Sequence, residues 1–440
     1  MNQAGAAKRA SRGDHLPPRW WRQERVLIAA LCLLAFLIRA IYVLSLENRI
    51  FWYDGQEYSR LALGLLEHGR YVNALDHPSA FWPPGYPLLL AVVYKLFGQS
   101  THGVCLVQSL VSALTVALVY LLGRRLVGRR AAILATLATA IYPLYIYSSG
   151  AFFPVTLQVA LLAGVILLAQ ITVERGSWVA AAAGGLLAGW AALTAASALP
   201  AAMVVLLWLV WTGGAGRAGA RSPRRQGVGL ALVFLLPVLL LVGAWTLRND
   251  RVLGRPIPVS TNGGYNLWLG NYPGVKASTG NREEVPGMKE ESQEIWGGSP
   301  TEPERDRAFS AKAREYIAAN PVRFLRLSLS KAAYLWSLYP EPMTQDRPRF
   351  ALEKPASLLS YGILLPFALV WLARSLRRNR GAPLVLFLFL VHTAVHAVVI
   401  SKVRYRLPLD TFVIIYGCGG LVALYDRVVL KKQVDVLNGR

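Results

Sequence analysis

The chain has 440 residues, of which 54% are hydrophobic, and a formal net charge of +23. Apolar runs long enough to cross a bilayer recur along most of it, which excludes a soluble domain. The positive charge falls in short Arg-rich loops between these runs. That pattern sets orientation in a membrane and needs no polyanion, so we expect no nucleic-acid partner.

The chain begins with a basic tail, residues 1–25, and the first long apolar run follows at residues 26–46. This run has about 21 residues, or about 32 Å as a helix, which is enough to cross a bilayer. It is longer than the core of a signal peptide, and no small-residue cleavage site follows it. We therefore expect an uncleaved anchor with the N-terminus in the cytoplasm.

The first outer loop, residues 47–101, contains a short apolar segment at residues 85–97. This segment has only about 13 residues and follows Pro84, so we predict that it lies in the membrane interface or re-enters it. If it spanned the bilayer, the basic cluster at Arg124 and Arg125 would fall outside, against the positive-inside rule.

The remaining apolar runs alternate between the two sides of the membrane, and the basic linker 213–227 falls inside. These runs are residues 104–122, 131–148, 152–171, 178–194, 198–212, 228–247, 356–373, 383–400 and 408–425. The sequence therefore predicts an all-α polytopic membrane protein, a bundle of about ten transmembrane helices with interfacial helices in the first outer loop. It divides into a cytoplasmic tail at 1–25, a transmembrane module at 26–247, a large extracytoplasmic loop at 248–355, and C-terminal helices with a cytoplasmic tail at 356–440.

The large loop is rich in Gly, Pro, Asn and Glu, and parity places it on the same side as the first outer loop. Residues 301–319 are predicted to form a helix, with acids in the first turns and Asn320-Pro321 as its stop. Residues 322–338 mix basic and apolar side chains, a composition typical of a helix that lies in the membrane surface.

Asp54 is the first candidate for chemistry, because it is a carboxylate placed just outside the first span. Asp54 followed by Glu57 also fits a capping box, at the start of a helix that ends at His68-Gly69. A capping aspartate need not be catalytic, but the two roles are compatible. The sequence leaves both interpretations open, with Glu57 as a second acid at the same place.

The second candidate is a run of cations on the outer side, where the positive-inside rule disfavours them. The run comprises Lys402, Arg404, Tyr405 and Arg406. An anionic headgroup would explain these cations, because arginine presents a fork of donors that matches phosphate oxygens. The alternative is ordinary snorkelling of long side chains at a helix end.

Further candidates for substrate contacts are polar and aromatic residues of the two outer loops. They are Tyr58, His77, Tyr86, Arg248, Asn262, Tyr265, Asn266 and Trp268. Aromatic rings offer flat surfaces on which sugars stack, and Gly and Asn allow tight turns. An aromatic interface belt explains the same composition.

We predict no metal site and no cofactor. His392 and His396 lie four residues apart on one helix face, a spacing that could bind a metal, but no third ligand follows from the sequence. Hydrogen bonding within the core is the favoured interpretation. The three cysteines each lie within an apolar run and are interpreted as small core residues.

Several of these motifs, taken together, resemble the GT-C membrane glycosyltransferases, in particular the group of protein O-mannosyltransferases and lipid A aminoarabinose transferases. The motifs are Asp54-x-x-Glu57-Tyr58, Pro83-Pro84-Gly85-Tyr86-Pro87, the run 120–126, the run 264–271, and Arg404-Tyr405-Arg406-Leu-Pro408. The resemblance implies a catalytic acid in the first outer loop, a polyprenyl- or dolichyl-phosphate sugar as donor, and an acceptor received by the later outer loop.

Two positions depart from that family. Many relatives carry two adjacent acids, whereas Gly55 follows Asp54 here, which makes a metal-binding acidic pair less favourable. Relatives of the aminoarabinose enzyme often have Lys before the Pro-Pro pair, where this chain has Trp82. We therefore expect Arg404 or Arg406 to supply the contact to the donor phosphate.

The sequence thus predicts a glycosyltransferase of the inner cell membrane whose active site is extracytoplasmic. Asp54 would act as the base, the anomeric carbon would be inverted, and the acceptor would be a hydroxyl of a protein, lipid or polysaccharide. The alternatives are a flippase or transporter of lipid-linked sugars, an O-antigen ligase or polymerase, and a scaffold without chemistry. A transporter should carry polar residues near mid-bilayer, whereas the spans between residues 131 and 247 are nearly free of charge.

Overall fold

The structure is a computed structural model that describes residues 19–51, 53–212, 223–338 and 353–430. Across these ranges the regular structure is helical, and pairing of the strand type is limited to one isolated bridge between Val72 and Pro78. Most of the basic tail and of the linker 213–227, and the end of the C-terminal tail, lie outside the described residues.

Within the described ranges, seven helical stretches are long and apolar enough to cross a membrane. The main helices of these stretches are α1 (Arg19–Leu44), α4 (Thr101–Leu126), α7 (Val155–Arg175), α10 (Pro223–Leu253), α16 (Ile363–Ser375), α17 (Gly381–Val398) and α18 (Leu407–Tyr425). Two short segments, α15 (Glu353–Ser357) and a π-helical turn (Leu358–Gly362), lead into α16.

Three further apolar elements complete the bundle. The helices α5 (Arg129–Ala140) and α6 (Pro143–Ser149) form one span that bends by 46° at its break. The helices α8 (Trp178–Thr194) and α9 (Ala198–Thr212) are shorter and pack beside α7 and α10. Among the described residues, the seven long stretches and the bent pair give up to eight spans by length and composition, which is roughly consistent with the predicted bundle of about ten, and α8 and α9 are shorter than a full span. The chain is a multi-pass membrane protein.

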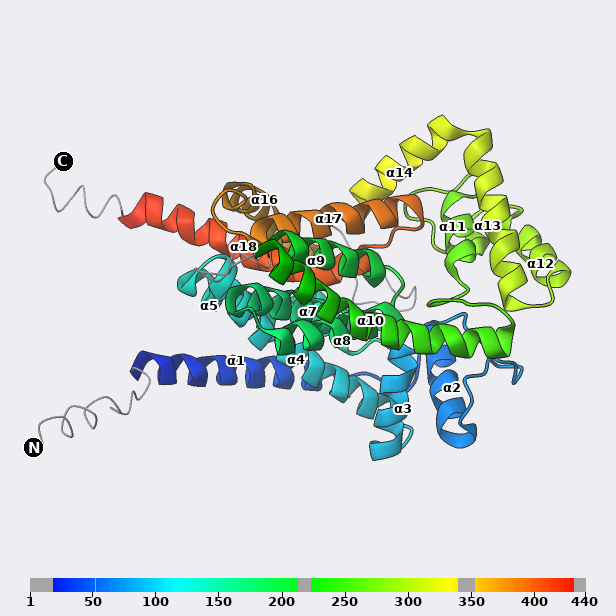
Figure 1. Cartoon of the computed structure of the whole chain (residues 1–440), viewed down its shortest axis with the longest axis horizontal. Coiled ribbons are helices and arrows are strands. Elements are labelled where there is room, and N and C mark those ends of the chain that lie inside the picture. Colours follow the sequence, from blue (N-terminus) through cyan, green and yellow to red (C-terminus); the bar gives the residue numbers. More distant parts are fainter. Residues whose placement is uncertain (1–18, 52, 213–222, 339–352, 431–440) are drawn as a thin grey trace, which may run out of the picture.

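Ion pairs between helices gather at one end of the bundle, on the left in Figure 1. Glu24 of α1 pairs with Arg124 of α4 at 3.4 Å and also with Arg129 of α5. Arg130 pairs with Asp426, which follows α18, at 2.8 Å. The first described helix begins and the last one ends here (Figure 1), so these charges lie where the sequence analysis expects the cytoplasmic side.

Arg39 is a fully buried cation in the middle of α1, and the sequence did not reveal its partner. Its guanidinium donates to the Ser112 hydroxyl at 2.7 Å and to the carbonyls of Ala140 and Thr139 at 2.7 and 3.1 Å. Ala140 is the last residue of α5, so Arg39 satisfies the carbonyls left open where the span bends. This contact explains a charge that would be costly in lipid.

The opposite end of the bundle carries the two helices of the first outer loop. They are α2 (Tyr53–His68) and α3 (Gly85–Phe97), and Figure 1 shows both lying across the long axis of the bundle. The bounds of α3 agree with the predicted interfacial segment. The helix α2 ends at His68, as predicted, and Gly69 follows with a positive φ of 62°.

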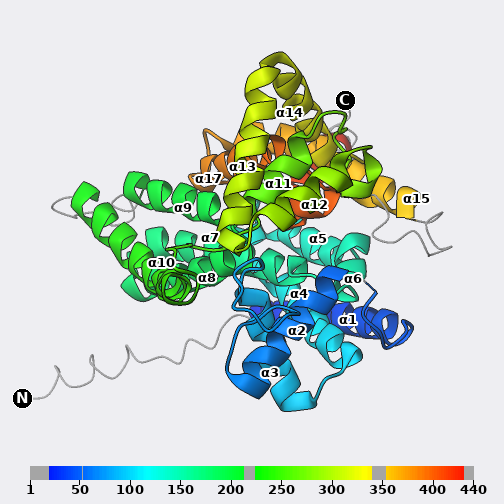
Figure 2. The ribbon, with the colours of Figure 1, turned by 90° about the vertical axis from the view of Figure 1, so that its right-hand side faces the viewer.

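The large loop folds into an outer layer, residues 263–335, at the same end (Figure 2). Its elements are α11 (Gly263–Asn271), a 3₁₀ turn (Arg282–Glu284), α12 (Met288–Gly298), α13 (Glu302–Ala319) and α14 (Pro321–Leu335). This layer has its own apolar core around Trp268 and Phe309. The predicted helix 301–319 is confirmed, including a capping box between Thr301 and Glu304.

Polar contacts join the first outer loop to the outer layer and to α10. The Glu302 carboxylate accepts hydrogen bonds from the Ala80 amide at 2.8 Å and from the Thr261 hydroxyl at 3.2 Å. Arg248 donates to the carbonyls of Ser79 and Tyr71, each at 2.7 Å. These bonds fix the loop beside α2 and therefore the surroundings of Asp54.

Candidate active site

Asp54 lies in the first turn of α2, one residue after the helix begins at Tyr53. Within the described part of the chain, no group donates a hydrogen bond to its carboxylate, so the capping-box interpretation is wrong. The helix N-terminus still favours a negative charge here. Gly55 packs so closely on Phe152 that a Cβ would come within 2.8 Å of that side chain, which holds α2 against the turn before α7.

Arg404 comes to the same place from the far end of the chain, in a 3₁₀ turn (Val403–Arg406) that leads into α18. Its guanidinium lies over the ring of Phe153 at 4.6 Å. Burial raises the pKa of the Asp54 carboxyl, and the nearby Arg404 charge offsets part of that rise. Among the described residues the two groups form no direct ion pair, although the Arg404 charge acts on the Asp54 carboxyl.

Two tyrosine hydroxyls border this pair of charges. The ring of Tyr58 packs on Trp82 at 5.0 Å and on Tyr86 at 5.1 Å. Burial raises the pKa of Tyr58 and of Tyr265, and the Asp54 charge contributes in both cases. Neither hydroxyl has a hydrogen-bond partner among the residues that the structure describes. Both are therefore available to a bound molecule.

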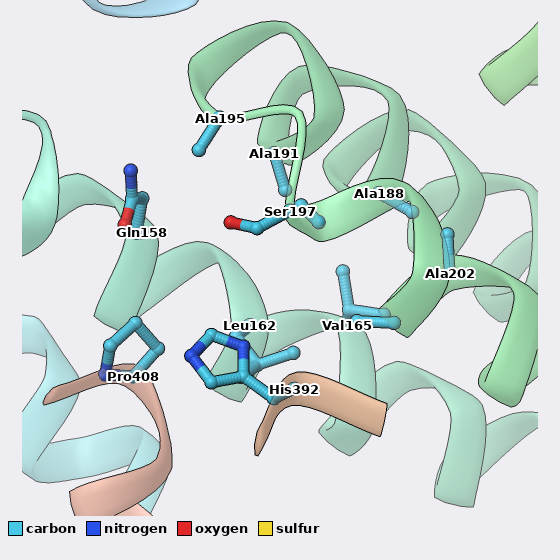
Figure 3. Close-up of a pocket in the computed structure, with 12 residues that line it drawn as sticks. Gln158, Leu162, Val165, Ala188, Ala191, Ala195, Ser197, Ala202, His392 and Pro408 are labelled. Atoms are coloured by element: carbon cyan, nitrogen blue, oxygen red, sulfur yellow. The ribbon is translucent and has the colours of Figure 1, made fainter. Parts of the chain in front are cut away.

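A small apolar cavity of about 40 Å³ lies between α7, α8, α9 and α17. Figure 3 shows three polar side chains, Gln158, Ser197 and His392, pointing into it among Ala, Leu and Val side chains. The His392 Nε2 donates to the Tyr405 carbonyl at 2.8 Å, which places the polar end of the cavity beside the segment that carries Arg404.

Comparison with known proteins gives one family match: residues 76–241 fit the model described as dolichyl-phosphate-mannose-protein mannosyltransferase. The structure is similar to that of AglB, the oligosaccharyltransferase from Archaeoglobus fulgidus, solved with an inhibitory peptide and a dolichol-phosphate. The TM-score is 0.54 at 15% identity, and the match covers 94% of this chain and 52% of that one. The family model matches 166 of the 440 residues, and at this identity the likeness to the solved structure shows a shared fold. No curated protein sequence matches it.

Two more solved structures are similar to this chain. The apo form of the same Archaeoglobus enzyme has a TM-score of 0.53 at 14% identity, with 96% of this chain and 53% of that one covered. ArnT from Cupriavidus metallidurans, bound to undecaprenyl phosphate, has a TM-score of 0.41 at 14% identity, with coverages of 94% and 80%, and carries no argument at that score. The chain spans about half the length of the Archaeoglobus enzyme.

Arg406 does not share the site with Arg404. It is fully buried, pairs with Asp410 at 3.2 Å, lies over the ring of Tyr361 and donates to the Ser337 carbonyl. A 3₁₀ turn has three residues per turn, so side chains two positions apart point to different sides. Of the two predicted arginines, the structure therefore brings only Arg404 to Asp54.

Lys402 and Tyr405 are also engaged elsewhere. Lys402 donates to the Ser278 carbonyl at 2.5 Å, which ties its segment to the outer layer. The ring of Tyr405 stacks on His396 at 4.8 Å, and its carbonyl accepts from His392. The histidine pair thus takes part in packing and hydrogen bonding, the interpretation that the sequence favoured.

Most of the other predicted site residues form contacts within the fold. Glu57 is buried and pairs with Arg60 at 2.5 Å. The Tyr86 hydroxyl donates to Gln108 at 3.0 Å, and the Trp268 indole donates to Glu291 at 2.8 Å. Arg248 donates hydrogen bonds to the first outer loop. Asn262 accepts a hydrogen bond from Ser260 at 2.8 Å, and Asn266 lies half-buried on α11. His77 is exposed in a turn and is not brought to Asp54.

Sequence reasoning missed Phe153, Gln158 and Ser197. Each lies within or beside an apolar run, where the residue type alone gives no signal. The one available clue is Phe152-Phe153-Pro154, because a proline after two aromatics marks the start of a helix at the membrane surface.

Proposed function

We propose that the protein transfers a sugar from a polyprenyl-phosphate donor to an acceptor hydroxyl on the extracytoplasmic side of the membrane. The observation that best supports this is the pair Asp54 and Arg404. Among the described residues, the Asp54 carboxylate has no hydrogen bond and the Arg404 guanidinium has no ion pair, and each lies in the electrostatic field of the other. Charged groups without a partner in the fold are candidates for direct contacts with a ligand.

In this mechanism the Asp54 carboxylate accepts the proton of the acceptor hydroxyl as its oxygen attacks the anomeric carbon. The bond between that carbon and the phosphate oxygen breaks, and polyprenyl phosphate leaves with the electron pair. Arg404 stabilises the charge that grows on the phosphate. A single displacement of this kind inverts the anomeric carbon. The raised pKa of Asp54 makes it a stronger base than an ordinary aspartate.

The surroundings of Arg404 favour a donor with one phosphate. Arg406 is used by Asp410, and Lys402 is bonded to the outer layer, which leaves Arg404 as the guanidinium beside Asp54 in the described region. The neutral groups that line the small cavity, Gln158, Ser197 and His392, suit hydrogen bonds to hydroxyl groups or phosphate oxygens.

The acceptor would approach between the first outer loop and the outer layer, where aromatic rings from both meet. Phe81 lies 6.2 Å from Tyr265 and 6.3 Å from Trp296, as ring centroids. Trp296 is exposed, so this cluster has an open edge. Tyr265, within the field of Asp54, would donate a hydrogen bond to the bound acceptor.

The test is incubation of the purified protein in nanodiscs with a panel of polyprenyl-phosphate sugars, with release of polyprenyl phosphate as the readout. Asp54→Asn should lower the rate by about 10²–10⁴-fold, the range for loss of a general base. Asp76→Asn is the matched control, because Asp76 is exposed and has a φ of 58° that asparagine accepts well.

The control variant should keep the wild-type rate. A folded Asp54→Asn protein with most of its activity would remove Asp54 from the mechanism. Passage of the intact donor across a sealed vesicle, with no polyprenyl phosphate released, would instead support the transporter alternative.

A further inference from the structure

Lys331 of α14 is a buried lysine with a 1% exposed side chain and, among the described residues, no carboxylate partner. Its ammonium has four oxygens within hydrogen-bonding distance. They are the carbonyls of Val398 and Val399 at 3.1 Å each, the Gly270 carbonyl at 3.2 Å and the Asn271 side-chain oxygen at 3.3 Å. A buried ammonium is costly unless such groups surround it, so this arrangement is specific.

The four oxygens come from the ends of two helices. Val398 and Val399 end α17, and Gly270 and Asn271 end α11. The last carbonyls of a helix lack partners within it, and a cation there is also favoured by the helix dipole. Lys331 therefore joins the outer layer to the end of a transmembrane helix.

The segment that follows α17, residues 399–405, carries Arg404, and we call it the arm. Two of its carbonyls accept hydrogen bonds from side chains of α17: His396 donates to Ile400 at 3.1 Å, and His392 donates to Tyr405 at 2.8 Å. Asn271 donates to Val398 at 3.0 Å, just before the arm. The arm is thus held at both ends, and Lys331 acts at its first residue.

The packing of Gly270 leaves the arm little room to shift toward α11. A Cβ on Gly270 would lie 1.9 Å from the Val399 carbonyl oxygen, so the two backbones are in direct contact. Loss of the Lys331 ammonium would leave these carbonyls facing each other without a shared donor. Repulsion between the acceptors would then move the start of the arm.

We propose that Lys331 is a positioning residue for sugar transfer: it holds the arm against α11 and so fixes the Arg404 guanidinium at the donor phosphate. This inference rests on the proposed role of Arg404. It also couples the outer layer, where the acceptor would bind, to the group that would bind the donor. A purely structural lysine would stabilise the fold without any selective effect on phosphate binding.

The test is a double-mutant cycle on ligand affinity in nanodiscs, with two probes: polyprenyl monophosphate and the matching polyprenol without the phosphate. Lys331→Met and Arg404→Gln should each weaken binding of the monophosphate by about 10-fold, the scale of one charge-assisted contact. Binding of the polyprenol should not change. The double variant should bind the monophosphate no more weakly than Arg404→Gln alone.

Arg326→Met is the matched control, because Arg326 is an exposed base on the same helix, and it should leave both affinities at the wild-type value. If Arg404→Gln does not weaken monophosphate binding, the proposed phosphate contact is wrong and the inference falls with it. If Arg404→Gln weakens binding but Lys331→Met does not, or the two effects add, or the polyprenol is weakened equally, only the inference about Lys331 is overturned.

Lys331→Met could fail to fold, in which case Asn271→Ala decides the matter. This milder change removes one oxygen that faces Lys331 and one donor to Val398. It should weaken monophosphate binding but not polyprenol binding, and its effect should vanish in the Arg404→Gln background. Equal weakening of both probes would contradict the positioning role.

Discussion

At the scale of single residues, the same two chemical groups occur twice at one end of the bundle with different surroundings. Asp410 and Arg406 form a buried ion pair with neither side chain exposed. Asp54 and Arg404 are half-buried and form no direct pair within the described residues. The first pair is used by the fold, and we propose that the second serves a ligand.

The pH dependence of transfer should report the interaction between Asp54 and Arg404. Asp54 acts as a base only when ionised, so the rate falls as the pH drops through its pKa. Arg404 lowers that pKa, and Arg404→Gln should therefore move the acid limb of the profile of kcat/KM to higher pH. Arg70→Gln, which removes an exposed cation paired with Asp76, is the control and should leave the limb in place. An unmoved limb in Arg404→Gln would show that its charge does not act on the base.

The buried pair predicts a stability effect of a different size. Arg406→Met leaves the Asp410 carboxylate unpaired in the interior and should cost about 3–5 kcal/mol of unfolding free energy. Thermal unfolding in detergent measures this as a large fall in Tm. Adding Asp410→Asn should recover much of the loss, because the unpaired charge is gone. Arg404→Gln, in contrast, should change Tm little, and a fall as large as that of Arg406→Met would contradict its assignment to a ligand.

At the scale of elements, patterns within the sequence were sufficient wherever length and polarity decide the outcome. The helix at residues 85–97 followed from the length of its apolar run, and the helix that ends at Ala319 followed from acids in its first turns and a proline after its end. The site did not follow so directly, because a run of three cations does not say which side chain faces where. The 3₁₀ turn directs the side chains of Arg404 and Arg406 to different sides, and tertiary packing places Phe153 against Arg404. Neither arrangement follows from the local sequence.

Two adjacent glycines of α11 offer a test of how this helix is packed. A Cβ on Gly264 would lie 2.0 Å from the Asp306 carbonyl oxygen, whereas a Cβ on Gly263 would meet nothing closer than 3.9 Å. Gly264→Ala should therefore force α11 and α13 apart and lower Tm by the equivalent of several kcal/mol. Gly263→Ala should be neutral or stabilising by up to about 1 kcal/mol, since alanine favours helix. Equal effects of the two changes would mean that α11 does not sit against α13 as described.

At the scale of the whole molecule, the outer layer rests on the bundle at one side and meets the predicted membrane surface at another. Figure 1 shows α14 descending from α13 toward α17. Its buried side carries Leu327, Lys331 and Leu335, while Val322 and Leu325 are 70% and 61% exposed. An exposed apolar stripe beside spans that face lipid is explained by a helix lying in the bilayer surface.

This placement can be measured with a fluorophore attached through an introduced cysteine. In nanodiscs that contain lipids with a quencher on the acyl chain, a probe at Leu325→Cys should be strongly quenched. A probe at Glu315→Cys, exposed on α13, should be quenched little. Equal quenching at the two positions would show that α14 stands clear of the lipid. The comparison should be made with the native cysteines replaced.

Under the proposed function, the two hydrogen bonds of Glu302 would limit the size of the acceptor. The Glu302 carboxylate links the first outer loop to the outer layer, at the boundary where an acceptor would have to enter. Hydrogen bonds to a charged group contribute about 1.5–3 kcal/mol each. A small acceptor could enter with this fastening intact, whereas a polymer or a folded protein would have to undo it. Under the proposed function, this one side chain would select acceptors by their size.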